Sequence, residues 1–490
     1  MMDTFIGIDL GTSAVKLLLV GADGGILNSV TKTYPVSYPQ SGWSEQNPED
    51  WLNAVERGIE ELISAVDPKS VKGISFGGQM HGLVVLDRDD NVIRPCILWN
   101  DGRTEKQTAY LNEVIGRRNL SEHTANIAFA GFTAPKILWL KENEPQNFAR
   151  ISKIMLPKDY IAYKLTGSFC TDYSDASGTL LLDVKNGDWS AYMCDICGVK
   201  REQLPELKQS FERTGYLKNQ YARQWGMGRV TIAAGAGDNA AAAIGTGNVN
   251  DGDCTISLGT SGTVFISQDN FSVDEHNALH SFCHANGRYH LMGCILSAAS
   301  CNSWWMESIL KTNDFAAEQQ GLQAKLGKND IYFLPYLMGE RSPHNDVNAR
   351  GAFIGMRPDT ARGDMTLAVL EGVAFALRDC IEVARANGLN INKAKLCGGG
   401  ARSVLWRQII ANVCNVEVEI PLAEEGPAYG GAMLAMVACG AYKTVEAAAS
   451  ALISIKSAIK PDAQIAADYQ KRYEVFTGLY PALKDVYPKI

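Results

Sequence analysis

Short runs in which apolar and polar residues alternate, and longer runs with one apolar helical face, follow one another along the chain. Residues 5–20 alternate around the turn Gly11-Thr12-Ser13 and lead into a second glycine-rich turn, which predicts a β-hairpin rather than a strand feeding a long helix. Asn47 followed by Pro48 predicts the start of a helix. Its predicted apolar face comprises Trp51, Val55, Ile59, Leu62 and Ile63. Strand-like runs follow at 71–76, 83–86 and 97–99. This alternation predicts an α/β architecture.

The segment Ile6–Lys16 has a near copy at Thr255–Val264, about half the chain length further on. A glycine-hydroxyl turn repeated between apolar runs predicts two related lobes, each with a nest of backbone N–H groups that fits a phosphate. Alignment of the copies sets Asp9 against Ser257, so only the first copy keeps a carboxylate there. The sequence contains no Walker loop and no Gly-x-Gly-x-x-Gly after a strand, which disfavours both common nucleotide-binding folds.

A polar, glycine-rich stretch at 246–253 is the predicted boundary between lobes at 1–247 and 248–490. Beyond it, apolar periodicity predicts a long helix over 366–386. A strand then enters a glycine triplet before a predicted helix at 404–413. Glycines at this place allow an anion to approach the backbone, but a simple turn that needs positive φ explains them equally well.

Two polar positions are candidates for chemistry. Asp238 follows a strand and two glycines at the mouth of an alanine-rich helix. It is a good N-cap residue, worth about 1 kcal/mol, and a helix N-terminus also favours an ionised carboxylate that can accept a proton. His81 lies in the turn 77–82 between two strands, where a structural hydrogen bond and a ligand contact are both reasonable.

Composition narrows the class of protein. A chain of 490 residues is long enough for two or more domains, and a net charge of −8 argues against nucleic acid or an anionic membrane as the main partner. We expect a cytoplasmic protein, since no signal peptide and no bilayer-length apolar run is visible. The twelve cysteines are expected to be reduced and buried, Cys194 and Cys197 included. A structural role is also expected for three histidines at four-residue intervals, His276, His280 and His284.

The chain resembles the FGGY carbohydrate kinases over nearly its whole length, and is most similar to members that phosphorylate xylulose. The segments Gly131–Asn143 and Gly351–Glu371 fit the two signature patterns of the family. Further matching stretches are Ile6–Lys16, Gly78–Gly82, Ile97–Arg103, Leu156–Tyr160, Ser174–Thr179, Gly237–Asn239, Ser257–Gly262, Phe333–Tyr336, Gly339–Arg341 with Pro343 and His344, and Gly398–Arg402. The resemblance implies two ribonuclease H-like lobes of the actin and hexokinase type, with a catalytic cleft between them.

The resemblance also implies the site. Asp238 matches the general base of the family, and Asp9 with Asp238 would hold Mg²⁺. Sugar contacts are implied for Met80, His81, Asp238 and Asn239. ATP contacts are implied for Gly11, Thr12, Ser13, Lys16, Gly259, Thr260, Ser261, Gly399, Gly400 and Arg402. Trp99, Asp101 and Arg103 are expected to brace the pocket. Family members are often dimers, so a homodimer is one assembly that the resemblance allows.

The expected reaction is transfer of phosphate from ATP to D-xylulose, giving D-xylulose 5-phosphate. Glycerol kinases of this family carry Arg-Glu where this chain has Met80 and His81, which disfavours glycerol and favours a ketopentose. The near alternative is another ketose or polyol, such as L-ribulose or L-xylulose. The alternative from another class is an actin-like or chaperone-type ATPase module, which would hydrolyse ATP without sugar and respond to a protein partner.

Overall fold

The computed structural model describes residues 2–422 and 425–490, and these form two compact units. Of the described residues, the first unit contains 2–249, 281–290 and 425–453. The second contains residues 250–280, 291–422 and 454–490. Each unit is therefore assembled from segments that are not contiguous in sequence. The division into functional lobes at 247/248 stays a prediction.

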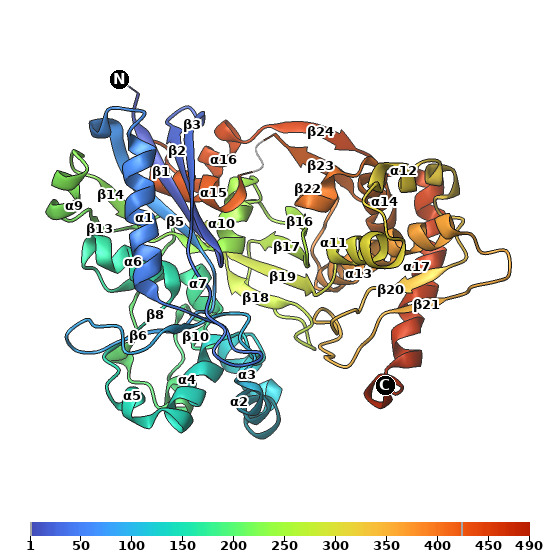
Figure 1. Cartoon of the computed structure of the whole chain (residues 1–490), viewed down its shortest axis with the longest axis horizontal. Helices are drawn as coiled ribbons and strands as arrows, with labels where there is room; N and C mark the ends of the chain where they lie inside the picture. Colours follow the sequence, from blue (N-terminus) through green and yellow to red (C-terminus); the bar gives the residue numbers. More distant parts are fainter. Residues whose placement is uncertain (1, 423–424) are drawn as a thin grey trace. The chain divides into compact units, whose positions relative to one another are not determined.

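The first unit is built on a twisted mixed sheet (Figure 1). The strand order is β13-β14-β5-β1-β2-β3. The strands are β1 (Thr4–Leu10), β2 (Ala14–Gly21), β3 (Ile26–Thr33), β5 (Val71–Gly78), β13 (Arg213–Tyr216) and β14 (Thr231–Ala233), and β15 (Ala236–Gly237) also pairs with β5. β1 pairs with β2 antiparallel and with β5 in parallel, and β5 also runs parallel to β14 and β15. The predicted hairpin around Gly11 is confirmed.

The second unit repeats this arrangement. Its strands belong to a sheet with the order β18-β19-β17-β16-β22-β23-β24, in which residues 281–283 of β18 and 289–290 of β19 are assigned to the first unit. The strands are β16 (Cys254–Leu258), β17 (Gly262–Gln268), β18 (His280–Cys283), β19 (Tyr289–Ile295), β22 (Lys393–Cys397), β23 (Glu417–Pro421) and β24 (Ile455–Ile459). As in the first sheet, the first strand of the repeat is antiparallel to the second and parallel to the strand on its other side. Asp9 lies one residue before Leu10, where β1 ends, and Ser257 lies one residue before Leu258, where β16 ends, so Ser257 is the counterpart of Asp9 along the strand. The hairpin registers differ by one residue, since Asp9 pairs with Lys16 and Ser257 with Thr263. The two related lobes inferred from the sequence repeat are confirmed.

Helices pack on both faces of the first sheet. Cross-strand partners share a face, so Leu17 points to the face opposite Gly7. A Cβ at Gly58 of helix α1 (Pro48–Ile63) would lie 2.5 Å from the Leu17 side chain, which places α1 on the face of the sheet to which Leu17 points. A Cβ at Gly7 would lie 1.8 Å from the Ala428 carbonyl oxygen of helix α15 (Gly426–Ala438), on the other face. Only glycine allows α15 to lie this close to the sheet.

Helix α10 (Asp238–Gly245) crosses α15 at an equally close distance. A Cβ at Gly430 would be 1.9 Å from the Ala241 carbonyl oxygen, and one at Gly245 would be 2.1 Å from the Gly426 carbonyl oxygen. Small residues on both helices thus fix α10 against α15, which is itself fixed against β1 and β5. This packing sets the position of the first residue of α10, Asp238.

Helix starts follow the capping chemistry expected from the sequence. The Asn47 side chain accepts a hydrogen bond from the Glu49 N–H at 3.2 Å, and Pro48 is the first residue of α1. Helix α14 (Val404–Cys414) begins after Ser403, whose hydroxyl accepts from the Trp406 N–H. Helix α13 (Arg362–Ala386) begins one turn earlier than predicted, because the Asp364 carboxylate accepts from the Ala361 N–H and satisfies the exposed helix end.

Further helices complete the two units. In the first unit they include α2 (Glu105–Ala109), α3 (Arg117–Thr124), α4 (Thr133–Asn143), α5 (Pro145–Ala149), α6 (Pro157–Thr166), α7 (Tyr173–Ser177), α8 (Ala191–Cys197), α9 (Asn219–Gln224) and α16 (Val445–Leu452). In the second they include α11 (Ala299–Ser303), α12 (Phe315–Gln319) and α17 (Ala463–Leu483). Short two-stranded sheets are formed by β4 (Glu45–Gln46) with β7 (Cys96–Ile97), β6 (Val84–Leu86) with β8 (Lys153–Met155), β9 (Cys170–Asp172) with β12 (Glu206–Lys208), β10 (Leu182–Asp183) with β11 (Asp188–Trp189), and β20 (Tyr332–Leu334) with β21 (Ala352–Ile354).

Most of the cysteines, together with His280 and His284, are buried, whereas His276 is exposed and Cys294, Cys397 and Cys439 are partly exposed. All twelve cysteines are free thiols, and Cys194 and Cys197 are buried on α8. The His284 ring donates its Nε2–H to the Asn248 carbonyl oxygen at 2.9 Å. Within the part of the chain that the structure describes, no helix combines the length and apolarity needed to cross a bilayer.

Candidate functional site

Two carboxylates from distant parts of the sequence lie at one edge of the first sheet. Asp9, near the end of β1, is in register with Gly77 of β5, and Gly237 of β15 is in register with Gly78. Asp238 follows Gly237 directly. Since β1, β5 and β15 run in the same direction, their carboxyl ends meet at the same edge, which is where open α/β sheets bind ligands. The structure therefore brings together the two acidic residues predicted from the sequence.

Asp238 does not cap the helix that it begins, and the N-cap interpretation is wrong. Gly237 occupies the N-cap position with extended backbone, and no side chain caps this end. The Asp238 carboxylate instead accepts hydrogen bonds at Oδ1 from the Asn239 backbone N–H (2.8 Å) and the Asn239 side-chain amide (2.9 Å). Burial raises the pKa of Asp238 to about 6, against the opposing effect of these hydrogen bonds. A carboxylate that titrates there is suited to accept a proton near neutral pH.

Asp9 lies in an environment that disfavours its negative charge. Burial raises the pKa of Asp9 to about 7, and the charge of Asp238 acts in the same direction, while Lys16 opposes it. Lys16 in turn forms an ion pair with Glu425 at the start of α15. Two neighbouring carboxylates that repel each other form a site that a divalent cation would stabilise.

The donor set of this site fits magnesium rather than a metal held by protein ligands alone. Among the described residues, no group of three or more His, Cys, Asp or Glu side chains is placed to hold a metal. Mg²⁺ typically takes one or two carboxylates and completes its octahedron with phosphate oxygens and water. Asp9 and Asp238 supply such a pair.

The turn between β1 and β2 is held by side chains from three segments. The Tyr34 hydroxyl donates to the Gly11 carbonyl oxygen at 2.5 Å, and the Gln46 side-chain amide donates to the Thr12 carbonyl oxygen at 2.7 Å. The Thr12 hydroxyl donates to Gln79 Oε1 at 3.1 Å and accepts from Trp99 Nε1 at 3.0 Å. Because its proton goes to Gln79, the Thr12 hydroxyl stabilises the shape of the turn.

Gln79 is a site residue that the sequence argument did not single out. Its amide donates to Gln46 Oε1 at 3.1 Å, and the same oxygen accepts from Trp51 Nε1. Gln79 therefore links the first turn to the apolar face of α1. It lies inside the matched segment Gly78–Gly82, but no pattern distinguishes a linking glutamine from a solvent-exposed one.

Met80 and His81 lie beside the base candidate. Met80 is 5% exposed, and a Cβ at Gly237 would lie 2.9 Å from its Cγ. His81 has a positive φ of 69°, and its ring stacks on Phe132 with centroids 4.6 Å apart. His81 Nδ1 lies 2.7 Å from the Gly178 carbonyl oxygen. A carbonyl only accepts hydrogen bonds, so Nδ1 carries a proton, and Nε2 is an acceptor when the ring is neutral.

In the second unit, the β16–β17 turn and the glycine triplet adjoin each other. Strands β16 and β22 are parallel with Ser257 opposite Cys397, and a Cβ at Gly398 would lie 2.7 Å from the Leu258 carbonyl carbon. The Thr260 carbonyl oxygen accepts from the Ala298 N–H at 2.9 Å. The remaining predicted ATP contacts of this unit lie on these two turns: Gly259, Thr260, Ser261, Gly399, Gly400 and Arg402.

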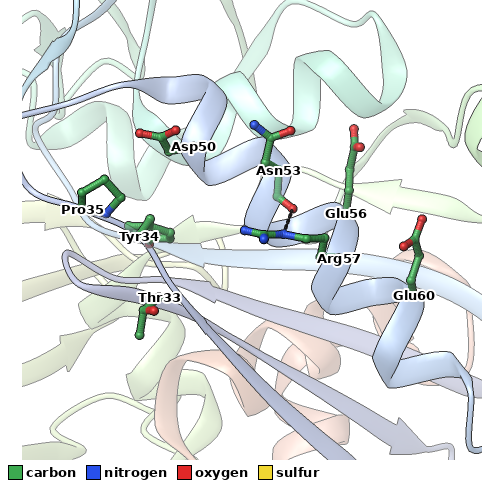
Figure 2. A pocket seen from close by; sticks show the side chains of 8 residues that line it. All are labelled: Thr33, Tyr34, Pro35, Asp50, Asn53, Glu56, Arg57 and Glu60. Carbon is green, nitrogen blue, oxygen red and sulfur yellow. Dashed lines mark hydrogen bonds between the residues drawn. The ribbon is translucent and has the colours of Figure 1, made fainter.

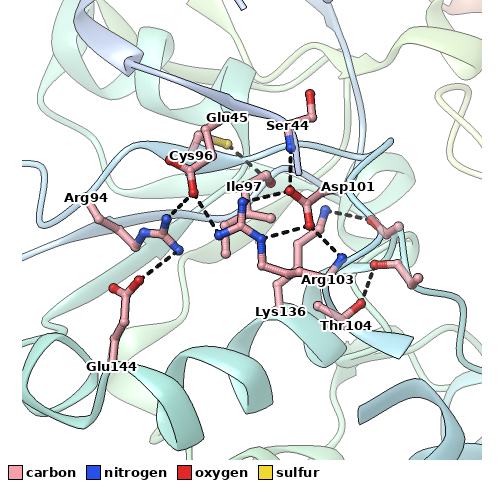
Figure 3. Close-up of polar contacts among 12 residues, drawn as sticks. Ser44, Glu45, Arg94, Cys96, Ile97, Asp101, Arg103, Thr104, Lys136 and Glu144 are labelled. Carbon is pink, nitrogen blue, oxygen red and sulfur yellow. Dashed lines mark hydrogen bonds and ion pairs between the residues drawn. The ribbon is translucent and has the colours of Figure 1, made fainter. Parts of the chain in front are cut away.

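A buried ion-pair cluster supports the segment after β7 (Figure 3). The Arg103 guanidinium donates to both carboxylate oxygens of Asp101, at 2.8 and 2.7 Å, and forms an ion pair with Glu45 at 2.7 Å. It also stacks over Trp43, 3.7 Å from the ring centroid. Trp99, just before this cluster, is 46% exposed and reaches Thr12.

A hollow of about 360 Å³ lies beside the first turn but contains none of the predicted contacts (Figure 2). It is lined by Thr33, Tyr34, Pro35, Asp50, Asn53, Glu56, Arg57 and Glu60. Arg57 Nε donates back to the Asn53 carbonyl oxygen at 3.2 Å. Three carboxylates against one guanidinium make this hollow unsuited to a phosphate.

Comparison with known proteins identifies the family of the chain. The N-terminal domain model of the FGGY family of carbohydrate kinases matches residues 4–245, and the C-terminal domain model matches residues 254–439. A protein named xylulose kinase from Escherichia coli (strain K12) is 41% identical over 481 residues, covering 98% of this chain and 99% of that protein.

Two solved structures have the same fold over the whole chain. A structure titled as a xyloylose kinase from Brucella ovis has a TM-score of 0.93 and 39% identity, covering 99% of this chain and 100% of that one. A gluconate kinase structure from Lactobacillus acidophilus has a TM-score of 0.95 and 27% identity, with full coverage of both chains. Fold similarity is thus shared by members named for different sugars. The two family models and the full-length relatives show that this chain belongs to the FGGY family of carbohydrate kinases.

Proposed function

We propose that this protein transfers the γ-phosphoryl group of ATP to D-xylulose, giving ADP and D-xylulose 5-phosphate. One observation supports the proposal most strongly. The Asp238 carboxylate lies next to a Met80-His81 turn, in a chain whose full-length relatives include proteins named xylulose kinase. The gluconate kinase structure is less similar in sequence, at 27% identity, than the xylulose kinase from Escherichia coli, at 41%.

In the proposed reaction, Asp238 is the general base. It accepts the proton of the sugar 5-hydroxyl as that oxygen forms a bond to the γ-phosphorus of ATP, and the bond from this phosphorus to the β,γ-bridging oxygen breaks to release ADP. The hydrogen bonds from Asn239 orient the carboxylate toward this task. Phosphoryl transfer also depends on positioning and charge stabilisation, so the carboxylate must be held in place as well as take the proton.

Several residues that lie next to Asp238 are proposed to contact the sugar. Met80 provides an apolar wall, and the acceptor Nε2 of His81 takes a hydrogen bond from a sugar hydroxyl. A hydroxyl of the wrong stereochemistry would leave that acceptor unsatisfied, which penalises the stereoisomer. Asn239 is the remaining proposed sugar contact.

ATP is proposed to contact both glycine-hydroxyl turns. In the first unit the contacts are Gly11, Thr12, Ser13 and Lys16, and Thr12 contributes backbone rather than hydroxyl donors because its hydroxyl binds Gln79. Asp9 and Asp238 would hold Mg²⁺, which when bound neutralises charge on the β- and γ-phosphates. A cytoplasmic location and a homodimer remain predictions from the sequence.

A panel of substrates tests the proposal. When ADP release is measured with purified protein, ATP and Mg²⁺, kcat/KM should be highest for D-xylulose. The other members of the panel are L-xylulose, L-ribulose, glycerol, gluconate and no sugar. A higher kcat/KM for another member would assign the chain to that substrate. ADP release that needs no sugar and rises with a protein partner would favour the actin-like or chaperone-type ATPase.

Gly178 offers a test of the sugar pocket alone. Its backbone (φ −77°, ψ −2°) suits alanine, but the added Cβ would lie 2.5 Å from His81 Nδ1 and 3.0 Å from the Met80 Cε. Since the His81 ring is held by Phe132 and Gly178, it has little room to yield. Gly178→Ala should therefore raise KM for D-xylulose by about tenfold or more and leave KM for ATP nearly unchanged. Gly228→Ala is the matched control, because a Cβ there meets nothing within 4 Å. Equal effects on both KM values would contradict the placement.

The dependence of kcat/KM on pH should follow the ionisation of Asp238. With the pKa of Asp238 raised to about 6 by burial, kcat/KM should fall about tenfold per unit below that pH and reach a plateau above it. Asn239→Ala removes a hydrogen bond that lowers this pKa, so the acid limb should move to higher pH. A limb that stays in place or moves to lower pH would show that another group controls the rate.

A further inference from the structure

Lys136 is a fully buried lysine that points at backbone rather than at an acid. It lies on α4, and its ammonium nitrogen Nζ is 2.8 Å from the His81 carbonyl oxygen and 2.7 Å from the Gly131 carbonyl oxygen. No carboxylate among the described residues forms an ion pair with it. A buried amine without a paired acid is costly to keep, which suggests that its hydrogen bonds serve a purpose.

The environment favours the neutral form of this amine. Burial lowers the pKa of Lys136 to about 7; the charges of Cys96 and Asp101 oppose this effect, and Arg103 adds to it. Figure 3 shows Lys136 beside the Asp101–Arg103 ion pair. A neutral amine has two N–H bonds, and the two carbonyl oxygens accept both. Both the neutral amine and the ammonium have N–H bonds for these two carbonyl oxygens, so Lys136 acts as a hydrogen-bond donor in either form.

The start of α4 holds the backbone and the ring of His81 together. The Thr133 hydroxyl donates to the same His81 carbonyl oxygen at 3.1 Å, and Phe132 stacks on the His81 ring. His81 has left-handed backbone geometry, which a residue other than glycine adopts only when its surroundings impose it. Lys136 and Thr133 fix the orientation of the His81 peptide, and this orientation sets where the ring points.

We propose that Lys136 is a positioning residue for sugar recognition, which acts by holding the His81 carbonyl oxygen so that the His81 ring presents Nε2 to the sugar. The inference rests on the proposed function, because it takes the Met80-His81 turn as the sugar contact. In this proposal Lys136 acts through the His81 carbonyl oxygen, and not directly on the substrate or on Asp238. Its loss should therefore affect binding of the sugar rather than the chemical step.

Lys136→Met tests this division, because methionine keeps the apolar stem and removes both hydrogen bonds. At pH 8, where the amine is mainly neutral, the change should raise KM for D-xylulose by about tenfold, leave kcat within about twofold and leave KM for ATP unchanged. Thr104→Val is the matched control. It removes a buried hydroxyl that donates to the Ala130 carbonyl oxygen at 2.9 Å, and should leave all three constants near wild type.

A double-mutant cycle with His81→Ala shows whether Lys136 acts through that residue. If it does, Lys136→Met should raise KM for D-xylulose much less in the His81→Ala protein than in wild type. An equal effect in both proteins overturns the proposal, as does a fall in kcat with KM unchanged. If Lys136→Met does not fold, Thr133→Val removes the other donor to the same carbonyl oxygen and should raise KM in the same direction.

Failure of the proposed function gives a different result. A wild-type protein that accepts another sugar of the panel, but not D-xylulose, contradicts the proposed substrate, and the Lys136 measurements then use the accepted sugar. A wild-type protein active on D-xylulose whose KM is unaffected by both Lys136→Met and Thr133→Val contradicts only the role of Lys136.

Discussion

Asp238→Asn should lower kcat by about 10³-fold or more while KM for ATP stays close to wild type. Asparagine keeps the shape of the side chain and an oxygen that can accept the hydrogen bond of the Asn239 N–H. What it removes is the ability to take the proton of the attacking hydroxyl. Turnover and ATP binding measured on the same preparation test the assignment. A kcat within about tenfold of wild type would reject Asp238 as the base.

The same substitution should stabilise the folded chain. Burial raises the pKa of Asp238 from an ordinary 3.8 to about 6, so the folded protein binds this proton more tightly than the unfolded chain does. The free energy of unfolding therefore falls as pH rises from about 3.8 to about 6, because the folded state must give up a proton that it binds more tightly. Above pH 6 the destabilisation by the charged Asp238 is complete. After allowance for water at the partly exposed carboxylate, Asp238→Asn should raise the free energy of unfolding at pH 8 by about 1–2 kcal/mol.

Thermal unfolding at two pH values separates this effect from a change in stability that does not depend on pH. The gain in Tm should be present at pH 8 and much smaller near pH 3, which is below both the ordinary pKa of 3.8 and the raised pKa of about 6, so that Asp238 is mainly protonated in both states. Asp195→Asn, on the exposed surface of α8, is the matched control and should change neither Tm nor kcat appreciably. A lower Tm for Asp238→Asn at pH 8 would mean that the charged form stabilises the fold, contrary to the direction inferred here.

Much of the fold could be predicted because it depends on local patterns. The Asn47-Pro48 cap and the hairpin around Gly11 each use residues that are close in sequence. The repeat of Ile6–Lys16 at Thr255–Val264 predicted two related sheets, because each copy carries the same turn between apolar strands. Family resemblance supplied the order of the site residues along the chain.

The parts that sequence could not predict depend on long-range packing. Residues 425–453 join the first unit through α15, which approaches Gly7 closely enough to exclude any side chain, and no local pattern specifies that partner. Asp238 was expected to cap its helix, but Gly237 takes that position and leaves the carboxylate to face Asn239. The roles of Gln79 and Lys136 arise from contacts across 33 and 55 residues, which become visible only once the chain is folded.

The second large effect is expected at Asp9. Asp9→Ser gives the first turn the residue that its counterpart has at Ser257. Loss of one carboxylate of the pair should lower kcat by about 10²-fold and raise the Mg²⁺ concentration needed for half-maximal rate by about tenfold. KM for D-xylulose should remain near wild type, since Met80 and His81 are unchanged. A titration of rate against Mg²⁺, with manganese(II) binding to the ATP complex as a second readout, measures both effects.

The reciprocal variant Ser257→Asp separates a metal role from a simple requirement for negative charge. It places a carboxylate one residue before the end of β16, as Asp9 lies one residue before the end of β1, at a turn whose predicted partner is phosphate. If Asp9 contributes only charge, Asp9→Ser with Ser257→Asp should recover activity. We expect the opposite: Ser257→Asp alone should raise KM for ATP by about tenfold through repulsion of the phosphates, and should leave the Mg²⁺ requirement of Asp9→Ser uncorrected. Recovery in the double variant would refute the division of roles between the two turns, because it would mean that a carboxylate at position 257 can replace the one at position 9.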